Sequence, residues 1–193
     1  MLDNLGNLER THSCGALRNT DIGKQVTLMG WVAKRRDFGD LTFVDLRDRD
    51  GLTQVVFNAK DASQAHAKAK DLRGEYVIAV FGEVVTRDEN TRNPKISTGD
   101  VEVHARELNI LNDARTPPFQ LDATSDLASE DLRLKYRYLD LRRPQLQANL
   151  RLRHRALTEI RNYMTERGFT EIETPILIKS TPEGARDYIV PAR

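Results

Sequence analysis

Apolar and polar side chains alternate along five short segments in the first half of the chain, with the period of a half-buried β-strand. Turn residues separate the segments. Between the second and third, Asp50-Gly51 predicts a hairpin, because glycine can supply the positive φ that such a turn requires. The pattern predicts a small β-barrel. The five segments are Val26 to Ala33, Leu41 to Arg47, Leu52 to Phe57, Tyr76 to Val85 and Val101 to Leu111.

An alanine-rich stretch that ends at Leu72 interrupts the strand pattern between the third and fourth segments. Asp61 precedes this stretch and Gln64 follows three residues later, which predicts a helix with Asp61 as its N-cap. Three strands, a helix and two strands is the element order of the OB-fold. Other small barrels also contain five strands and a helix, so the order favours this fold without proving it.

The second half of the chain follows a different pattern. Residues 112–129 show neither period and contain Thr116-Pro117-Pro118, so we expect a linker between one domain at residues 1–111 and another at residues 130–193. Pro144 suits the first turn of a helix and Gly168 the position just past its end. A strand is expected from Glu171 to Ile178, and too little chain follows it to cover the helix. The apolar stripe of that helix is Leu146, Leu150, Leu157, Ile160 and Met164.

Composition narrows the class of protein only slightly. The chain has 193 residues, 39% of them hydrophobic and 31% charged, as in ordinary globular proteins. Its single cysteine excludes an internal disulfide and argues against a thiolate metal site, so we expect no metal. No segment approaches the roughly 20 apolar residues of a membrane span, so we expect a cytoplasmic protein without a membrane partner.

Charge is distributed unevenly, although the net charge is only +1. Between Arg133 and Arg161 the sequence has nine basic and two acidic residues, a local net charge of +7. Such a stretch suits the backbone of a nucleic acid, whose phosphates release counterions when they are neutralised. It equally suits a solvated helix face, and the charge alone does not decide between the two.

The second and third predicted strands carry side chains that suit a single-stranded nucleic acid. On a strand that alternates, Phe43 shares a face with Leu41 and Asp45, and Val44 points the other way. An open-face aromatic can stack a base, and an amide such as that of Gln54 can hydrogen-bond a base edge. The alternative is that Phe43 is a core residue and Gln54 an ordinary solvent-facing one. The basic residues just before the first turn are Lys34, Arg35 and Arg36.

Three stretches resemble the bacterial aspartyl-tRNA synthetases, and the resemblance extends along nearly the whole chain. Residues 30–37 and 43–49 resemble the anticodon-binding domain of that family, and residues 134–144, LKYRYLDLRRP, resemble its hinge. Residues 168–175, GFTEIETP, resemble motif 1 of the class II synthetases. Residues 180–187, STPEGARD, resemble the loop that closes over aspartate and differ from the corresponding loop of the lysyl and asparaginyl relatives.

The resemblance implies a role for particular residues. Phe43 would stack on the middle uridine of the anticodon, and Gln54 would read the edge of that base, supported by Arg36 and the neighbouring Lys34 and Arg35. Glu183 would bind the α-ammonium group of aspartate in the closing loop, although a turn at the surface could also place a carboxylate there. Pro175 would lie at the dimer interface, although a proline that kinks an edge strand looks the same.

The resemblance also implies an overall fold and activity. The expected fold is an all-β OB-fold barrel followed by the start of an α+β class II catalytic domain. The expected parent is an aspartate–tRNA ligase, a homodimer that uses aspartate, tRNA, ATP and Mg²⁺. Motifs 2 and 3 do not follow Arg193, so we expect an inactive N-terminal fragment that contains no catalytic residue and binds no cofactor alone.

Two other functional classes remain open at this point. One is a non-enzymatic OB-fold module that binds tRNA or other single strands, which motif 1 and the closing loop argue against. The other is a protein-interaction domain, which only the uncovered helix stripe supports. The sequence does not distinguish an enzyme for aspartate tRNA alone from one that also charges asparagine tRNA, and Phe38 matches neither pattern.

Overall fold

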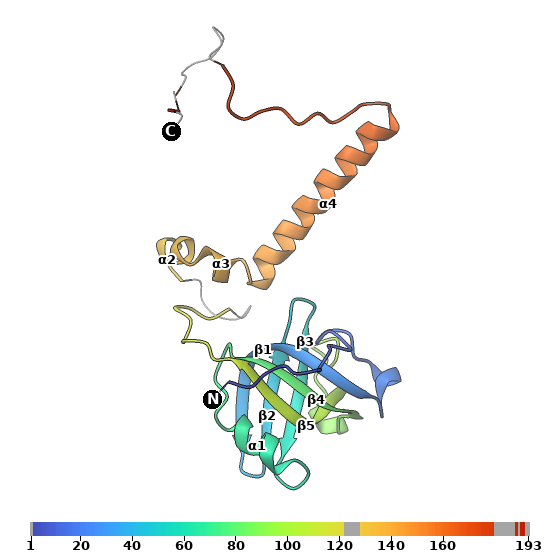
Figure 1. Ribbon diagram of the computed structural model, residues 1–193. Helices are drawn as coiled ribbons and strands as arrows, with labels where there is room; N and C mark the ends of the chain where they lie inside the picture. The colour runs from blue at the N-terminus through green and yellow to red at the C-terminus, as the bar shows by residue number, and fades with distance from the viewer. Residues whose placement is uncertain (1, 122–127, 180–187, 189, 192–193) are drawn as a thin grey trace. The chain divides into compact units, whose positions relative to one another are not determined.

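The computed structural model describes residues 2–121, 128–179, 188 and 190–191. The chain divides into two compact units, residues 1–132 and residues 133–193. Figure 1 shows the strands of the first unit wound into a barrel and one long helix in the second. Among the described residues, no helix combines the length and apolarity that crossing a bilayer demands.

Five strands close the barrel in the order β1-β2-β3-β5-β4. Strands β3 and β5 are parallel, and the other neighbouring pairs are antiparallel. Helix α1 (Ser63–Ala69) lies between β3 and β4 in the chain, so the predicted OB-fold order is confirmed. The strands are β1 (Gln25–Phe38), β2 (Leu41–Arg47), β3 (Leu52–Asn58), β4 (Val77–Thr86) and β5 (Val101–Asn112), with short 3-10 helices at Asn19–Asp21 and Glu89–Thr91.

The interior of the barrel is filled by the side chains that alternate inward. On β2, Val44 and Leu46 are fully buried, whereas Phe43, the residue before Val44, is only partly buried. Helix α1 contributes Ala65 and Ala69 to the same core, and Figure 1 shows the helix against one end of the barrel. The burial of alternate positions confirms the strand assignment that the sequence pattern predicted.

Strand β1 is longer than its apolar pattern predicted, because it continues past Ala33 to Phe38. Its first part pairs with β4 and its last part with β2, up to the pair Phe38–Leu41. A β-bulge lies where the register shifts between Val32 and Lys34. The polar residues of the second half of β1 are therefore strand residues, held by pairing with β2 and not by burial.

The predicted N-cap of α1 is wrong. Ala62 occupies the N-cap position, and no side chain caps the helix there. The Asp61 carboxylate instead accepts a hydrogen bond of 2.6 Å from the Asn58 side-chain amide. The Asp61 carboxylate is therefore bonded within the turn after β3 and does not cap the helix.

The predicted β2–β3 hairpin is confirmed, but the reason given for its glycine is wrong. The positive-φ glycines of the described residues are Gly6, Gly23, Gly39 and Gly168, and Gly51 is not among them. Gly51 is instead required by a close approach of two chain segments, because a Cβ there would lie 2.6 Å from Gly15 Cα. The Asp48 carboxylate holds the turn by accepting hydrogen bonds from the backbone amides of Asp50 (2.8 Å) and Gly51 (3.0 Å).

The second unit contains α3 (Arg137–Asp140) and α4 (Pro144–Glu166), and α2 (Glu130–Lys135) spans the boundary between the units. Helix α4 begins at Pro144 as predicted. After it, Gly168 has a φ of +83°, and the amides of Gly168 and Phe169 donate to the carbonyls of Thr165 and Met164. This hydrogen-bond pattern is a Schellman motif, which confirms the predicted helix end.

The apolar stripe of α4 lacks a covering layer among the described residues. Leu150, Leu157, Ile160 and Met164 are exposed, and none of the residues of α4 is buried. The strand predicted from Glu171 to Ile178 is wrong, since these residues form no strand. A strand needs a pairing partner for its backbone, and the described residues provide none for this segment.

We predict that Gly51→Ala lowers the free energy of unfolding by about 1–3 kcal/mol, because the added methyl group would collide with the backbone of Gly15. Urea unfolding, followed by the fluorescence of Trp31, measures the change. Gly74→Ala is the matched control, because a Cβ at Gly74 has no atom within 4 Å. Equal stability of the Gly51 variant and the parent chain would contradict the close approach.

Candidate nucleic-acid interface

Outward-facing side chains of the barrel line a hollow of about 500 Å³. They come mainly from β1, β2, β3 and β5, whose inward-facing neighbours form the core. Aromatic, amide, cationic and anionic groups all meet in this hollow. The lining residues are Arg36, Phe38, Leu41, Phe43, Gln54, Val56, Asn58, Asp88, Thr91, Glu102 and His104.

Phe43 lies on the outer face of β2, and the structure excludes the alternative that it is a core residue. It pairs directly with Arg36 of β1 and with Val56 of β3. The Phe38 ring meets it edge to face, with ring centroids 5.7 Å apart and an interplanar angle of 83°. An aromatic ring in this position, beside a cation and above an apolar floor, is suited to stacking a planar base.

Gln54 is held at both ends of its amide. Its Oε1 accepts a hydrogen bond of 3.1 Å from Arg36 Nη2, and its Nε2 donates one of 2.7 Å to Glu102 Oε2. The residue is only 8% exposed, so it is not the solvent-facing strand residue of the alternative interpretation. The donor on one side and the acceptor on the other determine which way round the amide lies.

Arg36 links the amide to a carboxylate. Its Nη2 lies 2.7 Å from Asp45 Oδ1, and the ion pair is partly buried. Burial raises the pKa of Asp45, and the positive charges of Arg36, Arg87 and Lys34 partly offset this effect. Lys34 and Asp45 are directly opposed in the β1–β2 register, so Lys34 also lies on the outer face.

Arg35 does not belong to this group of side chains. It lies opposite the buried Val44 in the register, and its Nη1 donates to the Ala69 carbonyl at the end of α1 at 3.5 Å. The structure therefore brings Phe43, Gln54, Arg36 and Lys34 to one face and directs Arg35 to another.

Several residues around this site were not predicted from the sequence, notably Glu102 and His104 of β5. Arg87 was also missed; its side chain is 3% exposed, and its Nε donates to the Val101 carbonyl at 3.0 Å and lies 3.8 Å from Glu102 Oε2. Burial lowers the pKa of Arg87, and the charge of Glu102 opposes this. The alternation of buried Val101 and Val103 with Glu102 was a signal that these side chains face outward.

The remaining predicted site residues belong to the second unit. Glu183 lies outside the described residues. Pro175 lies in an extended, exposed segment whose neighbours Ile176, Leu177 and Ile178 are also exposed. This is a run of apolar side chains in contact with solvent.

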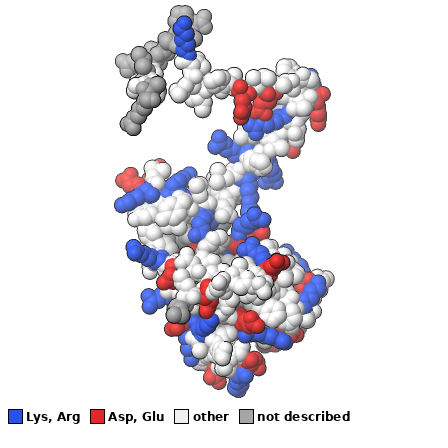
Figure 2. Space-filling view, in the orientation of Figure 1, with Lys and Arg blue, Asp and Glu red and all other residues white. Residues whose placement is uncertain are grey.

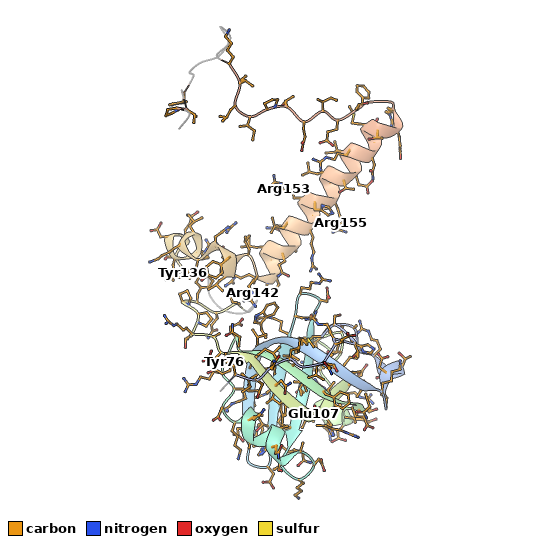
Figure 3. All side chains as sticks on the ribbon, in the orientation of Figure 1. Tyr76, Glu107, Tyr136, Arg142, Arg153 and Arg155 are labelled. Carbon is orange, nitrogen blue, oxygen red and sulfur yellow. The ribbon has the colours of Figure 1, made fainter. Side chains whose placement is uncertain are left out.

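Figure 2 shows acidic and basic residues interspersed over this face of the molecule. On α4, Arg153 and Arg155 project from different sides of the helix (Figure 3), since two residues correspond to a turn of roughly 200°. The basic residues of α4 therefore do not all lie on one side of the helix, and both interpretations of the stretch from Arg133 to Arg161 stay open.

We predict that Asp45→Asn raises the free energy of unfolding at about pH 7. The folded-state pKa of Asp45 lies above its ordinary value of 3.8, so the ionised carboxylate costs stability at neutral pH. The advantage of the variant should disappear below that ordinary pKa, where the parent carboxyl is protonated in both states. Urea unfolding across a pH series measures it.

Asp3→Asn is the control of opposite sign. A hydrogen bond from the backbone amide of Ile110 and another from Lys68 lower the pKa of Asp3, so its loss should destabilise the chain at neutral pH. Equal destabilisation by both substitutions would show that burial does not dominate at Asp45.

Comparison with known families agrees with this division of the chain. Residues 26–111 match the family described as OB-fold nucleic acid binding domain. Residues 129–193 match the family described as tRNA synthetases class II (D, K and N). The first match covers the barrel strands β1 to β5, and the second covers α4 and the segment that follows it.

Individual proteins match along the whole chain. The Aspartate--tRNA(Asp/Asn) ligase of Syntrophotalea carbinolica is 55% identical over 193 residues, which are 100% of this chain and 32% of that protein. The ligase of the same name from Desulfotalea psychrophila is 56% identical with the same coverage, 100% and 32%. A solved asparaginyl-tRNA synthetase from Pyrococcus horikoshii, complexed with asparaginyl-adenylate, is 27% identical, with a TM-score of 0.76 over 92% of this chain and 39% of that one.

The chain thus spans about a third of the length of the curated relatives it matches. Within that span, the OB-fold match comes first and the class II match second, as in the predicted domain order. Identity above one half from the first residue to the last, together with these two matches, shows that the chain belongs to the aspartyl-tRNA synthetase family.

Proposed function

We propose that this chain supplies the anticodon-reading domain, residues 1–111, and the start of the catalytic domain, residues 130–193, of an aspartate–tRNA ligase. Identity of 55% over all 193 residues to a protein of that name carries the proposal. The whole enzyme would join aspartate to tRNA through aspartyl-adenylate, with ATP and Mg²⁺, as a cytoplasmic homodimer. Because the matched relatives are named for aspartate and asparagine tRNA, we include both tRNAs.

The hollow on the barrel is suited to bind a single unstacked base. Phe43 would stack on the middle uridine of the anticodon, and such a contact is worth about 1–3 kcal/mol. Lys34 and Arg36 would favour the neighbouring phosphates, although the charge of Arg36 is already partly neutralised by Asp45 at 2.7 Å. Arg35 faces α1, so we assign it no contact with this base.

The amide of Gln54 suits the edge of uracil. Its Nε2 has a second N–H and its Oε1 a second lone pair, which match the O4 acceptor and the N3–H donor of that base. Cytosine presents the opposite pair of groups, and the amide would have to turn over to match it. Turning over would direct N–H groups of Gln54 at Arg36 and its oxygen at Glu102, so the two existing bonds oppose cytosine.

The catalytic half of the proposal rests on family membership and not on a described site. Among the described residues, no three or more His, Cys, Asp or Glu side chains are grouped so that they could hold a metal ion, and we assign none of them to Mg²⁺. We propose that Glu183 binds the α-ammonium group of aspartate, as a carboxylate opposite a cation would. The exposed apolar residues after Pro175 suit burial against a second copy of the enzyme in a dimer.

We predict that the 193-residue chain binds the anticodon stem-loop of aspartate tRNA, and that Phe43→Ala weakens binding by about 1–3 kcal/mol because stacking is lost. Fluorescence anisotropy with a labelled stem-loop measures the affinity, which should fall as the salt concentration rises. Phe81→Ala is the matched control, since Phe81 is a partly buried strand aromatic outside the hollow.

Discrimination between bases separates this proposal from the alternative of a general single-strand-binding module. A stem-loop with cytidine in place of the middle uridine should bind about 1–3 kcal/mol more weakly. Equal affinity for the two stem-loops would favour the general module, and no effect of Phe43→Ala would contradict the stacking role.

We predict that Glu183→Gln, in a ligase that contains this chain, raises the KM for aspartate more than the KM for ATP, because the lost charge faces only the amino acid. Aspartate-dependent exchange of pyrophosphate into ATP measures both values. Glu107→Gln, at an exposed position on β5, is the control. Equal changes in the two KM values would contradict the assigned role.

A further inference from the structure

One row of outward-facing positions crosses four adjacent strands of the barrel. Phe43 of β2 lies opposite Val56 of β3, Val56 opposite His104 of β5, and His104 opposite Glu83 of β4. Neighbouring strands are about 4.8 Å apart, so His104 lies roughly 10 Å from Phe43 along the row. The surface that begins at the stacking ring therefore continues across the barrel.

A second hollow, of about 240 Å³, follows the first along this row. The two hollows share Val56, Asn58 and His104, so His104 lies where one passes into the other. On the far side, Arg106 Nη2 is held 2.8 Å from Glu83 Oε2. A chain that leaves the base site at Phe43 in this direction must pass His104.

The imidazole of His104 is oriented by one protein partner and open on its other side. Its Nε2 lies 3.1 Å from Glu102 Oε1, and half of the side chain, 50%, is exposed. Within the described residues, Nδ1 has no hydrogen-bond partner. One nitrogen therefore fixes the ring, and the other is available to a ligand.

The charges around His104 favour its protonated form. The hydrogen bond to Glu102 raises the pKa of His104 above its ordinary 6.5, and the charges of Asp61 and Glu83 add to this, whereas burial opposes it. Arg106 is paired with Glu83, and Arg36 with Asp45. The charged groups that line the two hollows with it are Arg36 of β1, Asp61 after β3, Glu83 of β4, Asp88 after β4, and Glu102 and Arg106 of β5.

We propose that His104 is a second RNA-contacting residue of this surface, which donates a hydrogen bond from Nδ1 to an acceptor atom of the nucleotide next to the one stacked on Phe43. The proposal rests on the proposed function, because it needs RNA in the first hollow. It adds an imidazole donor to a site whose other charged groups are carboxylates and guanidinium groups.

The chemistry follows from the two forms of the ring. When Nε2 donates to Glu102 in the neutral ring, Nδ1 is an acceptor, and it becomes a charged donor on protonation. RNA that accepts from Nδ1 raises the pKa of His104 further, so binding takes up a proton. Affinity is then highest below the pKa of the free chain and falls as the pH rises through the pKa of the complex.

The test measures binding of the labelled anticodon stem-loop of aspartate tRNA to the 193-residue chain by anisotropy, from about pH 6 to about pH 8.5. We expect the parent chain to bind about fivefold more tightly at the lower pH. His104→Leu and His104→Gln should both remove this dependence and match the parent's weaker affinity. His12→Gln, outside both hollows, should retain the dependence and is the matched control.

The outcomes separate the two proposals. If the parent binds the stem-loop and Phe43→Ala weakens binding, but both His104 variants keep the parent's affinity and pH dependence, the role of His104 is overturned and the proposed function stands. If the parent does not bind the stem-loop, both proposals fall. If the parent binds but Phe43→Ala has no effect, the stacking role is overturned, and with it the place of His104 beside a stacked nucleotide.

The salt dependence identifies the acceptor atom. A contact to a phosphate oxygen should make the slope of log affinity against log salt shallower by about one in His104→Leu at the lower pH. A contact to a base should leave the slope unchanged and make the loss of affinity depend on the neighbouring base. Either result supports the role of His104.

Discussion

The parallel pairing of β3 with β5 is the constraint on which the candidate site depends. It joins segments about fifty residues apart and sets Val55 beside Val103 and Val56 beside His104. The inward members of these pairs fill the core, and the outward members form the surface beside Phe43. Without this pairing, Glu102 could not accept from Gln54, and the amide would lose one of the two bonds that determine its orientation.

The ionic network on this surface serves orientation more than stability. Desolvation opposes the charged forms of both Asp45 and Arg87, as the directions of their pKa shifts show. Apolar side chains of similar size could fill the same positions of the barrel with a smaller loss of solvation free energy. The arrangement instead holds hydrogen-bonding groups in place before any ligand arrives, so that little conformational freedom remains to be lost on binding.

The sequence predicted what depends on local pattern. Alternation placed Phe43 on the face of β2 opposite Val44, although it left open which face is the outer one, and helical spacing together with Pro144 and Gly168 located both ends of α4. It did not predict which strands are neighbours, so Glu102 and His104 were missed although each lies on a predicted strand. It also predicted Asp61 as the N-cap of α1, but the Asp61 carboxylate instead accepts a hydrogen bond from Asn58. A pairing partner that is distant in sequence cannot be inferred from periodicity alone.

The bulge in β1 has a consequence for which insertions and deletions the chain can tolerate. Val26, Leu28 and Val32 face the core at even-numbered positions, yet Lys34 and Arg36, also even, face outward. Ala33 is the extra residue that reverses the phase. Removing it would restore the regular alternation and keep Lys34 opposite Asp45 and Arg35 opposite Val44. Removing a residue after Lys34 would instead exchange the faces of the rest of the strand. The cationic half of β1 can therefore lose its bulge residue without turning a cation inward, but it has no such freedom of length beyond Lys34.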